Sequence, residues 1–537
     1  MGAAGTGFKT LYSRPFSPSR CPLMRTPALP NATTLAFLAW TVLFAPPLLG
    51  TPDLRTGVLV PLSALLWWPL VYLRPTRALA LLALVLAGAA NVVHIHYFGV
   101  LVDDSFMLTA ARTNAGELRE FASALSVDVL GWLLAWLAVA TLASVLVLRH
   151  APHWRALRSQ PGGRRVLWLV LCAWVVLCGW AFSRESLSKR FVYRLRHAYP
   201  LQVVSAAVRQ TEIAAALLYQ PRLPTAPVAG PQVDTVVVVL GESASAARWS
   251  LLGYAQEDTN APLRAIEGLQ TARTMAHGFV TSTALPFLLT GMDMGASVEQ
   301  AAPTFLDLAH SPQAGYKTFV FSNSRAFDTQ EDFFLRALRR SADVYRKVGD
   351  GEHDGVLTPH LEAALADPAP RKLIVLHTYG SHTQLEQRYP ARDYRLPDAY
   401  DNTIRYTSDL LAQWIALADQ RSAAQTALLL YASDHGMILP PCASDYRHGL
   451  SVTSLEVPLL AWGNARLRQS LSELLPRFTE QDKVDARHSN ALLARLALRA
   501  TGFSDVAAAP AWTETDAPRY KGRPWGEVKR GDACTPQ

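Results

Sequence analysis

Long apolar stretches in the first part of this 537-residue chain constrain its fold more than any other feature. A segment of about 20 apolar residues is long enough to cross a hydrocarbon core of about 30 Å. We expect spans at residues 34–50, 57–73, 77–98, 127–148 and 165–183. Prolines interrupt the first two of these stretches. The pattern predicts a membrane α-helical bundle of about five spans, followed by one large domain outside the bilayer.

Basic residues set the expected orientation of this bundle. They precede the first span and fill two connecting loops: Lys9, Arg14, Arg20 and Arg25, then Arg74 and Arg77, then Arg149, Arg155, Arg158, Arg164 and Arg165. Because positively charged loops stay in the cytoplasm, residues 1–33 are expected to form a cytoplasmic tail. A cleaved signal peptide fits poorly, since several apolar segments follow rather than one. An odd number of spans then places everything after residue 184 in the periplasm of a bacterial inner membrane.

The formal net charge of +8 has the same explanation, because many arginines lie beside the apolar segments. Neither a basic helix nor an aromatic RNA-binding motif accompanies the charge, so nucleic acid is not an expected partner. Residues 184–231 are basic and amphipathic and end in a proline-rich run, which predicts helices on the membrane surface followed by a linker.

Strand-like runs alternate with helical stretches from residue 232 onward, which is typical of α/β layering. We expect strands at residues 234–240, 317–322, 372–377, 426–432 and 457–462, and a helix at 396–420. The catalytic part is expected to cover residues 232–505. Residues 506–537 are rich in alanine, proline and charge, and are interpreted as a tail.

Two of these strands end in residues that carry chemistry. In the run from Asp234 to Leu240 the last five residues are apolar and mostly β-branched, as in a buried parallel strand, and Gly241 and Glu242 follow. The run beginning at Ala427 ends in Asp434 and His435. Ligands of open α/β sheets bind beyond the carboxyl ends of the strands. Glutamate, aspartate and histidine there, with a threonine from the loop 281–283, predict a site for a cation such as zinc.

The ordered set of motifs resembles one family over nearly the whole chain. The motifs are Gly241-Glu242-Ser243, Ser250-Leu-Leu-Gly-Tyr254, the threonine loop, Gly380-Ser-His382, Ser433-Asp434-His435-Gly436 and His448-Gly449. Together they look like the membrane-bound phosphoethanolamine transferases of the alkaline phosphatase and sulfatase superfamily. The resemblance implies an α/β/α catalytic domain in the periplasm, joined to the helical membrane part.

The resemblance also implies which residues act. The family's nucleophilic threonine lies five residues before a proline and about forty after the metal-binding glutamate, which matches Thr281; Thr283 is the alternative. The expected metal ligands are Glu242, Thr281, Asp434 and His435, holding one zinc ion, with a second ion as an option. His382 and His448 match family histidines near the phosphate. His377 is either a third such histidine or a satisfied core residue.

A polar loop between the third and fourth spans resembles the family's lipid-binding loop. Thr113, Asn114 and Glu117 are therefore interpreted as contacts of the donor lipid, although an ordinary interfacial connection has the same composition. Cys442 and Cys534 lie in the periplasmic half, where a disulfide between them is compatible with an oxidising compartment.

The resemblance implies transfer of phosphoethanolamine from phosphatidylethanolamine, through a covalent threonine intermediate, to lipopolysaccharide core or lipid A. The residues after Glu242 and after Gly436 are closer to branches that modify core sugars or other glycans. A phosphoglycerol transferase, or a sulfatase or phosphodiesterase of the same superfamily, is the alternative enzyme. An inactive membrane-anchored binding protein is the alternative from another class; it predicts lost ligands, whereas all four are present.

Overall fold

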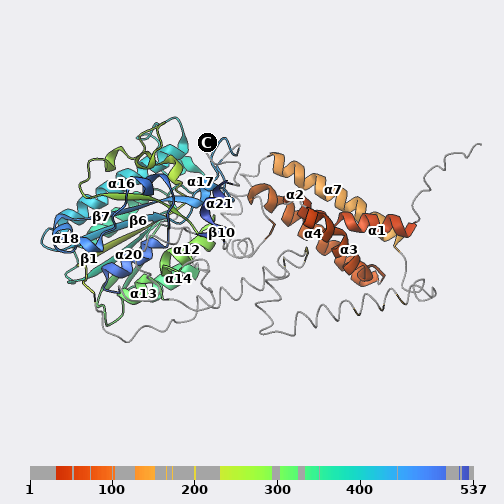
Figure 1. Ribbon diagram of the computed structural model, residues 1–537, viewed down its shortest axis with the longest axis horizontal. Coiled ribbons are helices and arrows are strands. Elements are labelled where there is room, and N and C mark those ends of the chain that lie inside the picture. The colour runs from red at the N-terminus through yellow and green to blue at the C-terminus, as the bar shows by residue number, and fades with distance from the viewer. Residues whose placement is uncertain are drawn as a thin grey trace, which may run out of the picture.

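The computed structural model describes two parts of the chain, a helical part and an α/β part (Figure 1). The described residues are 32–50, 54–72, 74–98, 101–102, 127–151, 165, 168, 172, 199–200, 203, 230–292, 303–323, 333–349, 351–443, 446–503, 519–520 and 523–530. All structural statements below refer to these residues. Thr113, Asn114, Glu117 and Cys534 lie outside them.

Apolar helices make up the first part. They are α1 (Ala32–Val42), α2 (Pro47–Gly50), α3 (Leu54–Trp67), the 3-10 helix η1 (Trp68–Tyr72), α4 (Arg74–Phe98) and α7 (Val127–His150). Two of them are long and apolar enough to cross a membrane, over Arg74–His96 and Val127–His150. Large leucines such as Leu79, Leu86 and Leu142 are exposed on these two helices, as expected of side chains that face lipid.

The first two predicted spans are each divided in the structure. The stretch 34–50 contains α1 and α2 separated by a turn, and the stretch 57–73 is completed by η1 after α3. Proline supplies the physical reason, since Pro46, Pro47 and Pro69 cannot donate the backbone hydrogen bonds that a continuous helix needs. The fifth predicted span lies almost entirely outside the described residues. The count of five spans is therefore not confirmed.

Helices α4 and α7 pack closely through one aromatic side chain. The Trp136 Nε1 donates to the backbone oxygen of Val85 at 3.0 Å. A Cβ atom on Gly88 would lie 2.1 Å from the Trp136 ring, so only glycine leaves room for this contact. A small residue at the crossing point is a common device for joining helices in membranes.

The α/β part is built on an eight-stranded sheet with the order β4-β3-β5-β1-β6-β7-β2-β8. Its strands are β1 (Thr235–Gly241), β2 (Gln270–Met275), β3 (Lys317–Ser322), β4 (Val344–Lys347), β5 (Lys372–His377), β6 (Ala427–Ser433), β7 (Glu456–Gly463) and β8 (His488–Ser489). Strands β4, β3, β5, β1 and β6 pair in parallel, whereas β7 is antiparallel to both β6 and β2. The five predicted strands are confirmed as β1, β3, β5, β6 and β7.

Helices cover both faces of this sheet. They are α12 (Thr281–Thr290), α13 (Phe305–Ala309), α14 (Phe333–Arg340), α15 (Thr358–Leu365), α16 (Ala399–Arg421), α17 (Val452–Leu455), α18 (Ala465–Ser470), α19 (Glu480–Val484), α20 (Leu492–Ala500) and α21 (Trp525–Arg530). Short 3-10 helices lie between them: η2 (Ala246–Arg248), η3 (Ser250–Leu252), η4 (Ala261–Leu263), η5 (Asp354–Leu357), η6 (Leu385–Gln387) and η7 (Ser472–Leu474).

Alternating side chains of β1 divide the core into two clusters. Val236, Val238 and Leu240 pack with residues of α12, α13 and α20, whereas Val237 and Val239 pack with residues of α15 and α16. This alternation is the ordinary consequence of the pleated strand. It produces the α/β/α layering that the sequence predicts, with α16 on one side of the sheet and α12 and α13 on the other (Figure 1).

The predicted helix 396–420 is confirmed as α16. Its start is fixed by Asp398, whose Oδ1 accepts a hydrogen bond from the backbone N–H of Tyr400 at 2.8 Å.

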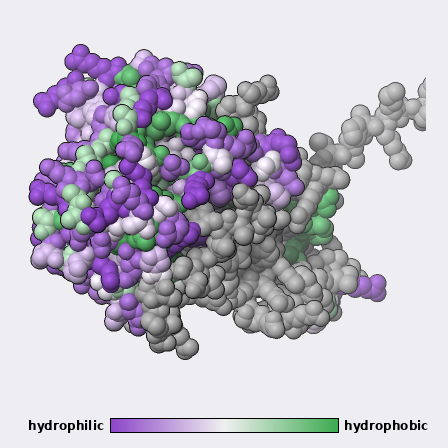
Figure 2. Space-filling view, turned by 60° about the vertical axis from the view of Figure 1, so that its left-hand side comes forward, coloured by the Kyte–Doolittle hydropathy of each residue, from purple (hydrophilic) through white to green (hydrophobic). Residues whose placement is uncertain are grey.

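On the face of the molecule shown in Figure 2, hydrophilic residues cover most of the α/β part, while the visible helical part is hydrophobic.

The carboxyl-terminal stretch differs from the tail that its composition predicts. Residues Arg519–Tyr520 and Arg523–Pro524 form the two short antiparallel strands β9 and β10, and α21 follows them. Trp525 at the start of α21 is only 4% exposed, so this stretch packs against the α/β part. Cys442 is disulfide-bonded, as a pairing with Cys534 requires.

Candidate active site

Two adjacent strands bring the predicted metal ligands together. Strands β1 and β6 pair in parallel with Gly241 opposite Ser433, so the residues that follow each strand meet at one edge of the sheet. The backbone N–H of Asp434 donates to the Gly241 oxygen at 3.0 Å and continues this pairing. Glu242, Asp434 and His435 are at most 5% exposed.

Thr281 joins these three side chains from the other side of the site. Its Oγ1 donates to the Glu242 Oε2 at 2.9 Å and lies 3.3 Å from the His435 Nε2. The His435 Nε2 is 3.3 Å from the Glu242 Oε1 and 3.5 Å from the Asp434 Oδ2. The four residues that the sequence singles out as metal ligands therefore converge on one point.

Thr281 is the first residue of α12, so a group bound beside it lies at the positive end of the helix dipole. The first N–H groups of a helix have no partners within the helix, and the helix dipole is positive at this end. The preceding residue, Val280, has extended backbone and makes no side-chain capping bond. An anionic group bound beside Thr281, such as a phosphoryl group, would be stabilised by these free N–H groups.

The alternative nucleophile, Thr283, points elsewhere. Its Oγ1 donates to the backbone oxygen of Val280 at 3.0 Å, within its own helical turn. A Cβ atom on Gly278 would lie 2.0 Å from the same hydroxyl oxygen, so Thr283 packs against this glycine. Of the two threonines, Thr281 is the one whose hydroxyl contacts Glu242 and His435.

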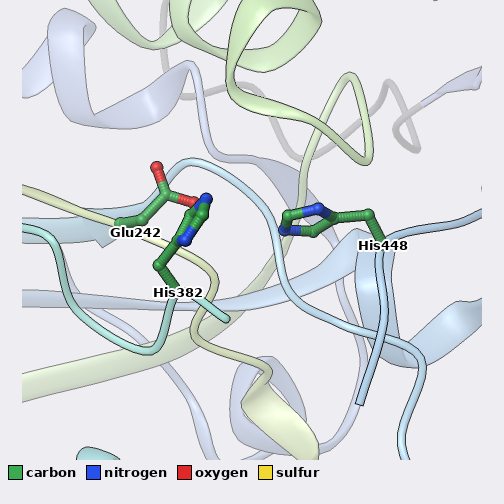
Figure 3. A group of neighbouring side chains, drawn as sticks. All are labelled: Glu242, His382 and His448. Carbon is green, nitrogen blue, oxygen red and sulfur yellow. The ribbon is translucent and has the colours of Figure 1, made fainter. Parts of the chain in front are cut away.

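Two further histidines lie beside the metal group. Figure 3 shows His448 pointing toward Glu242 and His382 from a separate segment of the chain. Ligand atoms of these three residues lie within 4.8 Å of one another, as do those of Glu242, Asp434 and His435. The His448 ring centroid is 5.0 Å from that of His435 and 5.6 Å from that of His382. Glu242 thus belongs to two possible metal groups.

Burial gives these groups unusual proton affinities. It raises the pKa of Glu242 to about 8, with a further contribution from the charge of Asp434, and it raises the pKa of Asp434 to about 7. Burial lowers the pKa of His435 below its usual value, and burial with the neighbouring His435 and His382 holds the pKa of His448 well below its usual range. The site therefore disfavours two carboxylate charges unless a cation offsets them.

A divalent cation fits this donor set. The Asp434 Oδ2 is buried and has no hydrogen-bond partner among the described residues, although such an oxygen is costly to leave unpaired. Two carboxylates, a neutral imidazole and a hydroxyl supply the oxygen and nitrogen ligands that zinc accepts. The Asp434 backbone is fixed in turn by Asn490, whose Nδ2 donates to the oxygens of Ser433 and Asp434 at 3.1 and 2.9 Å.

Ser243 supports the site in a way that its sequence position does not reveal. Its backbone has a φ of 57°, a conformation that non-glycine residues rarely adopt. In this conformation its Oγ donates to the Glu242 Oε1 at 2.6 Å and lies 3.3 Å from the His448 Nε2. The Tyr400 hydroxyl fixes the turn, since it donates to the Ser243 oxygen at 2.6 Å and accepts from the Ser245 N–H at 2.7 Å.

The loop that carries His382 has its own buried anchor. The Asp354 carboxylate accepts hydrogen bonds from the backbone N–H groups of Tyr379 and Gly380 at 2.7 and 2.9 Å. Tyr379 then stacks on His382 with ring centroids 4.6 Å apart, and the Arg388 guanidinium lies 4.7 Å from the centroid of Tyr379. Asp354 carries no sequence signal, because it lies in an irregular segment far from the motifs.

His377, the third histidine considered, lies at the end of β5. Its Nδ1 is 3.0 Å from the Ser322 Oγ, and the ring is 6% exposed. The geometry agrees with a satisfied core histidine.

Known proteins share both parts of the chain. Residues 234–502 match the family model described as Sulfatase, and residues 59–212 match the model described as Phosphoethanolamine transferase EptA/EptB. The chain is 27% identical over 296 residues to Phosphoethanolamine transferase EptC of Escherichia coli, covering 49% of this chain and 50% of that one. It is 26% identical over 496 residues to Phosphoethanolamine transferase CptA of Salmonella typhimurium, covering 83% of each chain.

The alignment with EptC thus spans about half the length of that relative. A solved structure with the same fold is the integral membrane protein lipooligosaccharide phosphoethanolamine transferase A from Neisseria meningitidis, with a TM-score of 0.58 and 17% identity, covering 90% of this chain and 97% of that one. The family models and the curated relatives confirm the resemblance on which the sequence interpretation relies.

Gly380 provides a test of the close approach between the His382 loop and β1. A Cβ atom there would lie 2.4 Å from the Glu242 backbone oxygen, and its φ of 48° is strained for any side chain. We expect Gly380→Ala to lower the free energy of unfolding by roughly 1–2 kcal/mol from backbone strain alone. Thermal unfolding in detergent measures this, with Gly526→Ala as control because nothing lies within 4 Å of its added Cβ. Equal midpoints for the two variants would contradict the close approach.

The raised pKa values predict how stability depends on pH without metal. The pKa of Glu242 is raised to about 8 and that of Asp434 to about 7, whereas unfolded chains ionise these groups near pH 4. Below the ordinary histidine pKa of about 6.5 the lowered pKa values of His435 and His448 oppose this effect, because the unfolded chain binds protons at these histidines. Above about pH 6.5 the folded metal-free protein binds more protons than the unfolded chain, so its free energy of unfolding falls as the pH rises. The midpoint of thermal unfolding in EDTA should therefore fall from about pH 7 to about pH 8.

Zinc should remove this decline, because a bound cation stabilises both ionised carboxylates. The stabilisation by zinc should then be larger at the upper end of the range than at the lower end. The Asp434→Asn variant is the control, since it removes one of the two buried charges. If the unfolding midpoint changed with pH in the same way in EDTA and in zinc, these carboxylates would not be the ligands of the metal.

Proposed function

The chain belongs to the sulfatase family, and on that premise we propose that it is a zinc-dependent phosphoethanolamine transferase of the bacterial inner membrane. The observation that carries the proposal is the placement of Thr281. Its hydroxyl lies at a helix amino terminus and contacts Glu242 and His435 directly. A half-buried hydroxyl among oxygen and nitrogen ligands is the arrangement that an activated nucleophile requires.

The proposed donor is phosphatidylethanolamine, and the proposed acceptor is lipopolysaccharide core or lipid A. The relatives EptC and CptA are named phosphoethanolamine transferases, which supports the transferred group. The match of residues 59–212 to the family model described as Phosphoethanolamine transferase EptA/EptB supports the same assignment. Thr113, Asn114 and Glu117 remain the proposed contacts of the donor lipid.

The first step is proposed to transfer the head group onto the protein. The Thr281 Oγ1 attacks the phosphorus of the donor, a new P–O bond to Thr281 forms, and the P–O bond to diacylglycerol breaks. The Thr281 proton passes to a basic group of the site, and a proton is returned to the leaving oxygen, so diacylglycerol departs as a neutral alcohol. Zinc bound by Glu242, Thr281, Asp434 and His435 would lower the pKa of the hydroxyl and offset the charge of the phosphoryl oxygens.

The second step reverses the first with another oxygen nucleophile. An oxygen of an acceptor hydroxyl or phosphate attacks the phosphorus of the phosphoethanolamine on Thr281, a P–O bond to the acceptor forms, and the P–O bond to Thr281 breaks. A basic group of the site takes the proton of an acceptor hydroxyl, and the Thr281 oxygen regains a proton. His382 and His448 are proposed to bind the phosphoryl oxygens and to move protons in both steps. Their position fits this role, since both rings lie near Glu242 and come from separate segments of the chain (Figure 3). The free N–H groups at the start of α12 would stabilise the remaining negative charge.

The membrane part is proposed to hold the catalytic domain beside its lipid substrate. Two described helices, Arg74–His96 and Val127–His150, are long enough to cross the bilayer. We propose a multi-pass arrangement of about five spans with residues 1–33 in the cytoplasm, since basic residues flank the connecting loops. Residues 232–505 would then act in the periplasm, where the donor and the acceptor glycan are both reached.

Intact-mass measurement tests donor, nucleophile and covalent mechanism together. Wild-type protein with zinc is incubated with phosphatidylethanolamine and compared with Thr281→Ala and with the matched control Thr283→Ala. We expect a phosphoethanolamine adduct on wild type and on Thr283→Ala, and a loss of about a thousandfold or more in Thr281→Ala, as for other nucleophiles. The control is informative because the Thr283 hydroxyl bonds to Val280 within its own turn.

Other outcomes would change the proposal in specific ways. An adduct lost only in Thr283→Ala would move the nucleophile by two residues. No adduct on any variant would refute phosphatidylethanolamine as the donor. An adduct formed instead with phosphatidylglycerol would identify a phosphoglycerol transferase.

A further inference from the structure

Helix α21 lies outside the residues that match the sulfatase model, yet it contacts segments that flank the site. The model covers residues 234–502, and α21 is Trp525–Arg530. Figure 1 shows α21 beside α17 and β10. The composition of this stretch predicts a tail, whereas α21 makes contacts with the α/β part. We therefore ask what these contacts do.

Trp525 is the main contact of this helix. It is 4% exposed and belongs to a compact hydrophobic cluster with Met275, Phe279, Val280, Val452, Leu455 and Ala486, against which Val528 also packs. Phe279 and Val280 directly precede Thr281, and Val280 is the N-cap residue immediately before α12. The indole therefore packs in the same cluster as the residues that lead into the nucleophile.

A buried carboxylate holds α21 in this position. The Glu456 Oε1 accepts hydrogen bonds from the Trp525 Nε1 at 3.1 Å and from the Lys529 Nζ at 3.0 Å. The Glu456 Oε2 accepts from the Arg273 Nη1 at 2.9 Å. Glu456 is 1% exposed, so its hydrogen bonds to charged partners are shielded from water. The orientation of α21 is thus specified by polar bonds as well as by apolar packing.

The same cluster reaches the second segment of the site. Helix α17 (Val452–Leu455) begins four residues after His448, and both Val452 and Leu455 contact the cluster that contains Trp525. The Ala276 N–H donates to the Leu455 oxygen at 2.7 Å and ties the two segments together. Two segments on one side of the site, the one that leads into Thr281 and the one that follows His448, therefore belong to the same cluster as α21.

We propose that α21 is a positioning element for the nucleophile, with Trp525 as its central residue. The start of α12 lacks a side-chain cap, so packing of Phe279 and Val280 under Trp525 fixes where Thr281 lies relative to Glu242. Trp525 acts through these residues, whereas Thr281 itself contacts the converging ligands. This inference rests on the proposed role of Thr281, and it adds a part of the chain that the family model does not include.

The size of the effect follows from the sensitivity of transfer reactions to geometry. A displacement of about 1 Å of a reacting group can cost about a hundredfold in rate. The metal ligands Glu242, Asp434 and His435 follow β1 and β6 and are absent from the Trp525 cluster. Loss of Trp525 should therefore slow the reaction of Thr281 without removing bound zinc.

Three full-length variants in detergent test this. Trp525→Ala removes the indole, Trp525→Phe keeps an aromatic ring but loses the hydrogen bond to Glu456, and Glu527→Gln is the control on an exposed residue of the same helix. The measurements are the rate of adduct formation with phosphatidylethanolamine, the zinc content, and amide hydrogen exchange of residues 276–289 with 399–421 as the internal reference.

We expect Trp525→Ala to slow adduct formation by about ten- to a hundredfold, with zinc content unchanged and faster exchange only in residues 276–289. Trp525→Phe should fall between this variant and wild type, and Glu527→Gln should equal wild type. If Trp525→Ala does not fold, Lys529→Met, which removes one bond to Glu456, should show the same pattern in weaker form.

Unchanged adduct formation and exchange in Trp525→Ala would overturn the proposal. Loss of zinc together with faster exchange in both segments would also overturn it, because α21 would then stabilise the whole domain. Absence of an adduct on wild type would refute the transferase proposal alone. The exchange of residues 276–289 would still decide whether Trp525 fixes the start of α12.

Discussion

The parallel pairing of β1 with β6 is the constraint on which the rest of the site depends. Because Gly241 lies opposite Ser433, Glu242 and the Asp434-His435 pair leave the sheet at the same point. Two carboxylates buried side by side are costly, and the raised pKa of each expresses that cost. A cation is the simplest compensation. The convergence of these residues therefore brings two carboxylate charges together and also supplies the ligands for a cation that would offset them.

Residues around this point hold the ligands in conformations that they would not adopt alone. Ser243 has a positive φ, and Gly380 approaches the backbone of Glu242 so closely that a side chain has no room. Tyr400 and Asp354 fix these two turns through buried hydrogen bonds. Strained backbone persists only where its surroundings determine it strongly, and such places are common at active sites. The support comes from segments that are distant in sequence, which ties the site to the integrity of the whole domain.

The chain combines this domain with an amino-terminal part that is apolar on its outside. Exposed leucines on α4 and α7 would be unfavourable in water but are suited to lipid. Such a part keeps the catalytic domain near membrane-embedded molecules, which favours a lipid as the proposed donor. Helix α21, beyond the residues that match the sulfatase model, adds contacts to the segment before α12 from the other end of the sequence. The residues that match the model supply the converging ligands, and α21 packs beside them.

Sequence alone determined the five strands that are continuous apolar runs, and it identified Glu242 and Asp434 because each directly follows such a run. It missed β2, β4 and β8, which are short or carry polar residues and so lack a clear pattern. Spacing favoured Thr281 over Thr283, but only the tertiary structure shows which hydroxyl faces the ligands, since the two chemically identical groups lie two residues apart on different sides of the helix. Composition predicted a tail where Trp525 is buried. A local sequence pattern indicates which side chains of one helix or strand are buried. Contacts between segments that are distant in sequence form only when the chain folds.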